Sequence, residues 1–249
     1  MLKILIVSAH EDDLETGMGG TALRLKQAGH RLESIVTTRA PRDKVYEPEG
    51  RSIREVRMDE SYKSHELLGI TPFFLDFEEG DPRMDKTTRE IFGEKVRSFN
   101  PDVVFVHWPV DVNPDHRQVA ALTIEAFMQK GMNTEVFCYE VFSEVGRPQS
   151  LGFYPTHYVD VSRVQELKFD MISCMKSQGP EALWAGSEEM QVMRGDECSV
   201  NQAEAFVRIT RYGDLHAELA QIMRPTRFKL PAGMGVKVNP TKIGLSVPA

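Results

Sequence analysis

Four ionisable residues in succession, His10-Glu-Asp-Asp13, follow the first apolar run of the sequence. Crowding acids at the end of a buried segment costs free energy unless a cation neutralises them. His10 and Asp13 are three residues apart in a turn that enters a helix, so an imidazole and a carboxylate can converge on a metal ion. Asp12 lies between them, where it can take a proton from a water molecule that the metal activates. A single acid here is more simply a helix cap, but the whole cluster favours a metal site.

A second polar cluster follows a later apolar run and reads His107-Trp-Pro-Val-Asp-Val-Asn-Pro-Asp-His116. An imidazole from this segment could complete a site of two histidines and one aspartate. Three protein ligands with an open position are typical of a catalytic zinc, whereas structural zinc sites usually have four. Asp115, next to His116, could orient a ligand without binding the metal itself. A lone histidine at a helix start is more often only a helix-start residue, but two such clusters together favour a metal centre.

The apolar pattern predicts the elements that would position these clusters. Short apolar or β-branched runs predict strands over 2–9, 31–38, 73–77, 102–106 and 135–142. Helical patterns between them predict a helix ending near residue 29 and others over 52–68, 87–99 and 116–129. This alternation indicates a parallel sheet with helices on both faces. Such sheets bind ligands beyond the carboxyl ends of their strands, here after Ala9, Phe77 and Val106.

The second half of the sequence is less regular. We expect a strand over 157–161, helices over 162–175 and 202–209, and a tail from residue 224. Earlier in the chain we expect a loop over 41–50 and a glycine-rich turn at Gly17, Gly19 and Gly20. The predicted fold is a Rossmann-like three-layer α/β sandwich with a mostly parallel sheet and an appended C-terminal region. We expect one domain, 1–249, with its core over 1–145 and the C-terminal region and tail over 146–249.

Composition narrows the class of protein. The formal net charge of −7 and the scattered basic residues argue against a nucleic acid or an anionic membrane as partner. No apolar run approaches the roughly 20 residues needed to span a bilayer, and the N-terminal run lacks the features of a signal peptide. The three cysteines have no metal-like spacing and fit reduced thiols. We therefore expect a cytoplasmic protein that acts on a small molecule, with self-association through the tail as a further expectation.

Both polar clusters resemble known signatures. The segment from His10 to Glu15, followed by Gly19-Gly-Thr21, resembles the first signature of the LmbE-like (PIG-L) family of zinc-dependent N-acetylglucosaminyl deacetylases. Asn113-Pro-Asp-His116 resembles the second signature. The resemblance implies hydrolysis of the N-acetyl amide of an N-acetylglucosamine-type sugar or conjugate. Glu11 stands where family members usually have proline.

The resemblance also implies roles for individual residues. His10, Asp13 and His116 would bind Zn²⁺, although iron(II), cobalt or manganese also suits such a site. Asp12 would be the general base that activates water. Glu15 and Asp115 are expected to support the ligands from outside the coordination sphere.

Weaker similarities follow in the family's order along most of residues 1–210. Arg57-Met-Asp-Glu60 resembles the family's Arg-x-x-Glu helix, whose arginine contacts substrate. Glu79-Gly80 resembles a sugar-binding loop in which aspartate is usual in place of Glu79. Pro155 to Val161, with Lys168 and Ser177-Gln178, resembles the family's C-terminal half. We therefore expect Arg57 and Glu79 to bind substrate, together with His107 from the second cluster.

Asn113 is the departure that matters for chemistry, because the family usually has histidine there. An asparagine amide can donate a hydrogen bond to an oxyanion but cannot supply a proton at neutral pH. Asp12, once protonated, could act as both base and acid, or His107 or another nearby group could supply the proton. The third alternative is a divergent member that keeps the metal and binds sugar without turnover. We favour retained hydrolysis, because the three expected ligands and the base are all present.

Two other classes of function remain for comparison. A dinucleotide-binding protein shares the predicted layout but needs a G-x-G-x-x-G turn after the first strand. Carboxylates fill that turn here and would repel a pyrophosphate, which argues against this class. An amidase that acts on another small-molecule conjugate would differ only in its substrate.

Overall fold

The computed structural model describes residues 1–41, 44–81, 83–129, 133–142, 148–209, 219 and 221–225. Eight strands form one sheet in the order β10-β8-β9-β7-β6-β1-β2-β5. They are β1 (Lys3–Ser8), β2 (Arg31–Arg39), β5 (Phe73–Glu78), β6 (Val103–His107), β7 (Glu135–Tyr139), β8 (His157–Asp160), β9 (Ala203–Ile209) and β10 (Met223–Pro225). The helices are α1 (Asp13–Gln27), α2 (Ile53–Leu67), α3 (Lys86–Ser98), α4 (Pro114–Phe127), α5 (Gln165–Ser173) and α6 (Pro180–Cys198), with short turns η1 (Pro148–Leu151) and η2 (Lys176–Gln178).

The five strands β5, β2, β1, β6 and β7 are parallel and form the centre of the sheet. Strand β1 shows why its sequence is almost wholly apolar. Ile4 and Ile6 enter one hydrophobic core, whereas Leu5 and Val7 enter the other, because successive side chains of a strand point to opposite faces. A strand buried on both faces has no place for the polar alternation of a surface strand.

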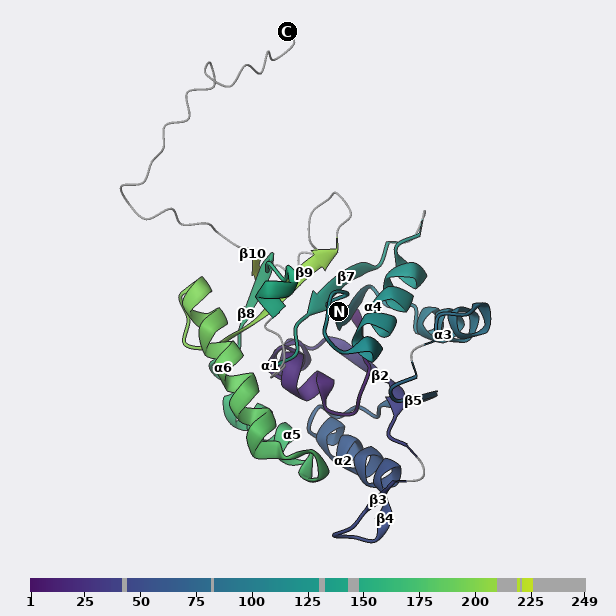
Figure 1. Cartoon of the computed structure of the whole chain (residues 1–249). Coiled ribbons are helices and arrows are strands. Elements are labelled where there is room, and N and C mark those ends of the chain that lie inside the picture. Colours follow the sequence, from purple (N-terminus) through teal and green to yellow (C-terminus); the bar gives the residue numbers. More distant parts are fainter. Residues whose placement is uncertain are drawn as a thin grey trace, which may run out of the picture.

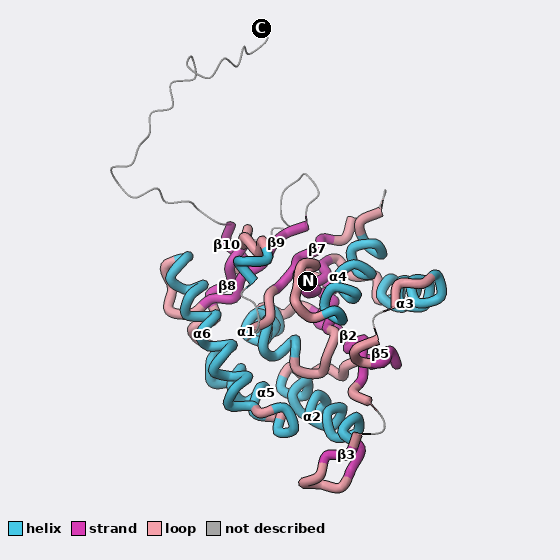
Figure 2. Tube along the Cα trace, in the orientation of Figure 1, coloured by secondary structure: helices cyan, strands magenta, loops and turns pink. Residues whose placement is uncertain are grey.

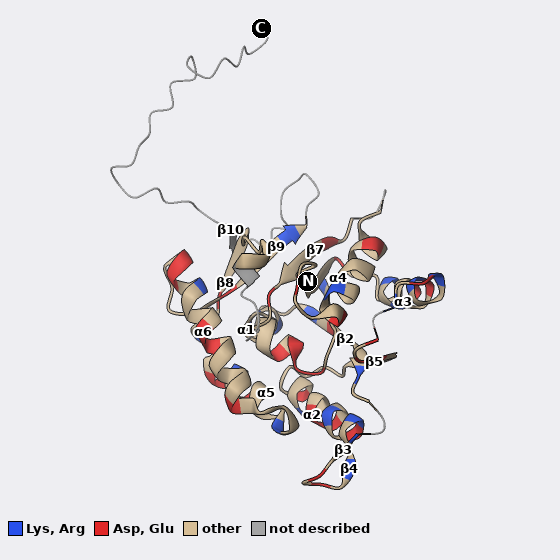
Figure 3. Ribbon diagram, in the orientation of Figure 1, with Lys and Arg blue, Asp and Glu red and all other residues tan. Residues whose placement is uncertain are grey.

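Helices cover both faces of the sheet. Figures 1 and 2 show α1, α2, α5 and α6 on one side of the strands and α3 and α4 on the other. The first core packs residues of α1 and α5 against the sheet, and the second packs residues of α3 and α4. This three-layer arrangement around a mostly parallel sheet confirms the predicted fold class. Acidic and basic residues are interspersed along α2 and α3 (Figure 3).

The C-terminal region extends the same sheet. Strand β9 pairs antiparallel with both β7 and β8, and β10 pairs antiparallel with β8. The helix predicted over 202–209 is therefore wrong, since β9 spans Ala203–Ile209. Its alanines and glutamate favour a helix locally, but pairing on both edges and burial of Phe206 override that preference. The tail expected from residue 224 lies outside the described residues beyond position 225.

The glycine-rich segment also differs from the expected turn. Gly17, Gly19 and Gly20 lie inside α1, which is interrupted at Met18 (φ −148°, ψ 20°). A Cβ atom on Gly17 would stand 2.7 Å from the Tyr139 ring, and one on Gly20 would stand 2.7 Å from Val161. Glycine is needed at these two positions because α1 lies so close to the sheet.

Two remaining features concern the surface. The loop expected over 41–50 contains part of a small hairpin, in which β3 (Val45–Tyr46) pairs antiparallel with β4 (Arg51–Ser52). None of the helices in the described part of the chain combines the length and apolar character that crossing a bilayer requires.

Candidate metal centre

His10, Asp13 and His116 converge at the carboxyl edge of the parallel sheet. His10 follows β1, Asp13 is the first residue of α1, and His116 lies in the first turn of α4. His116 Nε2 is 3.2 Å from His10 Nδ1 and 3.3 Å from Asp13 Oδ1, and His10 Nδ1 is 3.4 Å from Asp13 Oδ2. All three residues are buried.

These separations suit a bound metal ion. A tetrahedral ion with bonds of about 2.0–2.2 Å holds its ligand atoms about 3.3–3.6 Å apart. The two imidazole nitrogens are 3.2 Å apart, and each lies 3.3–3.4 Å from one of the two Asp13 carboxylate oxygens, which is close to that spacing. The residues present therefore fit a divalent transition metal with a further position for water or substrate.

Two aspartates orient the imidazoles from behind. Asp115 Oδ2 lies 3.2 Å from His10 Nε2 and accepts the Gly80 N–H at 2.8 Å. Asp111 Oδ2 lies 3.1 Å from His116 Nδ1. In both pairs the remote ring nitrogen meets a carboxylate, which leaves the other nitrogen for a metal. The sequence analysis predicted that Asp115 supports a ligand but did not predict a role for Asp111. The one feature of the sequence that pointed to Asp111 was its place in the polar segment before α4.

His107 lies underneath the site and not at its mouth. Its side chain is 0% exposed, and its ring stacks on the His116 ring with centroids 4.0 Å apart. His107 Nε2 is 3.1 Å from Asp13 Oδ2, accepts the Ala9 N–H at 3.0 Å and lies 3.3 Å from Tyr139 Oη. The expected contact of His107 with substrate, and its use as a proton donor there, are therefore corrected. A buried strand residue points into the core and supports Asp13.

The electrostatics of the cluster favour positive charge among its nitrogens. Burial alone would lower the pKa of His116, but Asp13 and Asp111 outweigh burial and raise that pKa to about 9. Burial would raise the pKa of Asp13, yet His116, His107 and His10 hold it well below its ordinary range. Asp13 thus stays ionised as a ligand must, and the surrounding carboxylates favour a cation between them.

Asp12 is free for chemistry because it does not cap the helix it precedes. It occupies the N-cap position of α1, but its side chain makes no capping hydrogen bond. Burial and the charge of Asp13 raise the pKa of Asp12, while His10 and Arg57 oppose the rise. Neighbouring carboxylates whose pKa values are pushed in opposite directions suit two different roles, a ligand and a base.

Arg57 and Glu79 lie together on the side of α2 and the loop after β5. Arg57 Nη1 donates to Glu79 Oε2 at 3.3 Å, and the Arg57 charge acts on the pKa of both Asp12 and Glu11. Two other segments that resemble the family also contact each other. Ser177 donates its backbone N–H and its hydroxyl to the carboxylate of Glu60, each at 2.7 Å.

Asn113 and Glu15 have surroundings that the sequence did not predict. Asn113 is the N-cap of α4, where its Oδ1 accepts the Asp115 N–H at 2.8 Å. Because Oδ1 serves the cap, the amide nitrogen is the atom left to donate. Glu15 faces α2, with its Oε1 3.5 Å from His65 Nδ1, and its pKa is raised to about 8 by burial. The expected support of a metal ligand by Glu15 is therefore corrected, because its carboxylate lies against His65 of α2.

Comparison with known proteins finds a family domain in this chain. Residues 5–127 match the PIG-L family model, described as GlcNAc-PI de-N-acetylase. The chain therefore carries a PIG-L (LmbE-like) family domain, as its two signatures predicted. It is 29% identical to the diacetylchitobiose deacetylase of Thermococcus kodakarensis over 192 residues, which cover 73% of this chain and 72% of that protein.

Two further likenesses are to hydratases. The chain is 25% identical over 224 residues to the 4-oxalmesaconate hydratase of Pseudomonas putida, covering 84% of this chain and 86% of that protein. The crystal structure of GalB, the 4-carboxy-2-hydroxymuconate hydratase of Pseudomonas putida KT2440, superposes with a TM-score of 0.71 at 21% identity. That superposition covers 87% of this chain and 99% of GalB, and at this identity it bears on the fold alone.

Proposed function

We propose that this protein is a metal-dependent hydrolase that removes the N-acetyl group from an N-acetylglucosamine-type amino sugar or conjugate. The observation that carries the proposal is the triangle formed by the buried His10, Asp13 and His116 side chains, with nitrogen–nitrogen and nitrogen–oxygen distances of 3.2–3.4 Å. The Asp12 side chain, which does not cap the helix, is next to it in the chain. The likeness to a diacetylchitobiose deacetylase supports this substrate class.

The residues around the triangle divide the work of amide hydrolysis. A zinc ion held by His10, Asp13 and His116 would polarise the amide carbonyl and lower the pKa of a water molecule. Asp12 takes the proton of the attacking water, for which its raised pKa is suited. The same carboxyl group, now protonated, can return that proton to the leaving nitrogen.

Asn113 determines how the amine leaves. In its position a histidine could donate a proton, whereas the asparagine nitrogen can only donate a hydrogen bond. We infer that the Asn113 amide steadies the oxyanion and that Asp12 carries the proton in both steps. Arg57 and Glu79, paired at 3.3 Å, supply the charged and hydrogen-bonding groups for the sugar.

A hydratase is the second candidate, favoured by two observations. The hydratase relative matches more of this chain than the deacetylase relative does, 84% against 73%. Addition of water to a carbon–carbon double bond also has no amine leaving group, so it does not need the acid that Asn113 lacks. A silent sugar-binding member and an amidase for another conjugate are the remaining alternatives.

The test measures acetate release from N-acetylglucosamine, N,N′-diacetylchitobiose and a panel of related conjugates by zinc-reconstituted protein. Wild type is compared with Asp12→Ala and Asn113→His. We expect turnover by wild type that falls at least about 10²-fold in Asp12→Ala, the range for loss of a general base. Activity only in Asn113→His would identify a binding protein.

If wild type and both variants bind zinc but release no acetate, the deacetylase proposal is contradicted. Loss of ultraviolet absorbance as water adds to an unsaturated tricarboxylic acid, the kind of substrate that the hydratase relatives are named for, would then support the hydratase.

A further inference from the structure

Helix α1 is broken one turn after the metal cluster, at Met18. A break in a helix leaves carbonyl groups before it and N–H groups after it without their usual backbone partners. Buried groups of this kind cost free energy unless other polar atoms satisfy them. Thr16, on the near side of the break, and Gly20 and Thr21, on the far side, are all buried. Their partners come from the C-terminal region.

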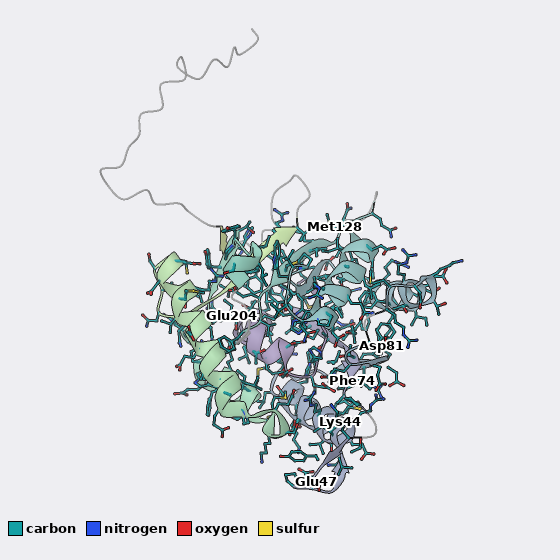
Figure 4. The ribbon with its side chains drawn as sticks, viewed as in Figure 1. Lys44, Glu47, Phe74, Asp81, Met128 and Glu204 are labelled. Carbon is teal, nitrogen blue, oxygen red and sulfur yellow. The ribbon has the colours of Figure 1, made fainter. Side chains whose placement is uncertain are left out.

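Glu204 of β9 satisfies the far side of the break. Its Oε1 accepts the Gly20 N–H at 2.9 Å, and its Oε2 accepts the Thr21 N–H at 2.6 Å. The carboxylate is therefore an N-cap for the second part of α1, supplied from another element. Figure 4 labels Glu204 between α1 and the C-terminal helices.

Lys168 of α5 and Ser187 of α6 satisfy the near side. Lys168 Nζ donates to the Thr16 carbonyl oxygen at 3.1 Å, and Ser187 Oγ donates to the same oxygen at 2.7 Å. Lys168 Nζ also donates to Glu204 Oε1 at 2.7 Å, so the two sides are joined by one ion pair. We call Lys168, Ser187 and Glu204 the clamp.

The clamp connects to the metal cluster through Thr16. Thr16 donates its N–H to the Asp12 carbonyl oxygen at 3.1 Å and its hydroxyl to the same oxygen at 2.9 Å. The segment 12–16 is thus a single turn. It begins with the expected base and an expected ligand, and it ends at Thr16, whose carbonyl oxygen the clamp holds. A buried ion pair adds little net stability compared with apolar residues of similar size. Its directional hydrogen bonds on both sides of the break are what apolar residues could not replace.

We propose that Lys168, Ser187 and Glu204 are positioning residues for the metal centre, which fix the turn that carries Asp12 and Asp13. The proposal rests on the proposed function in one respect, that Asp13 holds a metal ion. It makes the C-terminal region part of the site, although that region lies beyond the residues that match the family model.

The test reads metal geometry directly through the visible spectrum and the dissociation constant of cobalt(II) bound to the full chain. The main variant is the double substitution Lys168→Met with Glu204→Gln, which removes both charges together. The matched control is Arg194→Met with Glu140→Gln, because Arg194 and Glu140 form an equally buried pair, 2.6 Å apart, that joins α6 to the end of β7. His10→Ala shows that cobalt(II) binds at the proposed ligands.

We expect the clamp variant to bind cobalt(II) about tenfold more weakly than wild type, the lower end of the range for groups that support ligands. Its spectrum should shift, while the control keeps wild-type affinity within about twofold and an unchanged spectrum, even if both melt at lower temperature. Ser187→Ala, which removes one hydrogen bond and no charge, should weaken binding about twofold to threefold and serves if the double variant does not fold.

Equal effects of the clamp and control variants would show a merely structural role and overturn the proposal. So would wild-type affinity and spectrum in both the clamp variant and Ser187→Ala, or wild type that binds no cobalt(II). Wild type that binds cobalt(II) normally but releases no acetate would instead overturn the proposed function and leave the positioning role standing.

Discussion

At the scale of single residues, the proposed metal centre depends on side chains that hold its histidines from the side opposite the expected metal. His10 and His116 each have one ring nitrogen against a carboxylate, Asp115 and Asp111 respectively. Such contacts fix the orientation of an imidazole and raise its basicity as a ligand. Asp115 also holds the Gly80 N–H, whereas the Asp111 side chain meets His116 and the Asn113 N–H.

Asp111→Asn tests this support. The amide is neutral and cannot hold the His116 ring by charge, so we expect affinity for zinc or cobalt(II) to fall about 10- to 100-fold. A competition titration against a chelating dye measures the change. Asp59→Asn is the control, because Asp59 is half-buried on the outer side of α2 and its carboxylate pairs with Arg51 at 2.7 Å. Affinity within twofold of wild type in Asp111→Asn would contradict the assignment.

Residue types and spacing were enough to predict His10, Asp13 and the segment containing His116, because a turn of three residues and the carboxyl ends of parallel strands restrict where side chains can meet. The same reasoning could not separate His107 from His116. Both histidines end or follow the same strand, and only the phase of the strand decides that His107 points into the core.

At the scale of elements, α1 lies so close to its neighbours that two adjacent glycines differ in the space available for a side chain. A Cβ atom on Gly20 would lie 2.7–2.8 Å from Val161 side-chain atoms, whereas one on Gly19 would find its nearest neighbour at 3.5 Å. We expect Gly20→Ala to destabilise the protein by about 1–3 kcal/mol through overpacking. Gly19→Ala should be neutral or stabilise it by up to about 1 kcal/mol. Urea unfolding measures both, and equal values would show that α1 moves freely.

His65, which packs α2 against β2, predicts how the stability of the protein changes with pH. His65 is fully buried, its Nδ1 donates to the Ser61 carbonyl oxygen at 2.8 Å, and its Nε2 meets Ser34 Oγ at 2.9 Å. Burial lowers the pKa of His65 to about 4. The unfolded chain therefore binds a proton below about pH 6.5 that the folded protein does not bind until about pH 4.

This difference in proton binding between the folded and unfolded chains sets the direction in which stability changes with pH. The contribution of His65 to stability is complete above about pH 6.5 and is lost as the pH falls toward 4. Between pH 7 and 5 wild type should lose about 2 kcal/mol more than His65→Gln, which does not titrate. Urea unfolding at the two pH values gives the comparison, and parallel losses in both proteins would contradict a neutral buried His65.

The parallel strands and the helices between them could be predicted because each has a strong local pattern. Strand β9 could not, because Ala-Glu-Ala at its start is a helical pattern and only its two strand neighbours make it extended. The break in α1 had a visible signal in its glycines, but the polar groups that satisfy it lie about 150 to 190 residues further along the chain.

At the scale of the whole molecule, the C-terminal region and the parallel core share one hydrophobic core. Phe206 of β9 packs edge-on against Phe105 of β6 with ring centroids 5.2 Å apart. Val161, Val164 and Met171 belong to the same buried cluster as Ile4 and Ile6.

We therefore expect a chain cut to residues 1–145 to lack a cooperative thermal transition and to bind no cobalt(II). Circular dichroism melts and metal titration of this fragment, beside the full chain, test the expectation. A fragment that melts cooperatively and binds the metal would show that the region after residue 145 is a separate addition.

The single carboxylate oxygen of Asp115 that meets both His10 and the Gly80 N–H has a thermodynamic consequence. The loop that carries Glu79 and the imidazole of His10, which we propose binds the metal, have one partner in common. If sugar binding fixes the position of that loop, it also fixes Asp115 and through it the His10 ring. The free energies of binding for sugar and metal are then coupled. Coupling of this kind is reciprocal: whatever factor the metal adds to the affinity for sugar, the sugar adds to the affinity for metal. If the proposed site holds zinc, the protein molecules with sugar bound would then be the last to lose the metal when zinc is scarce.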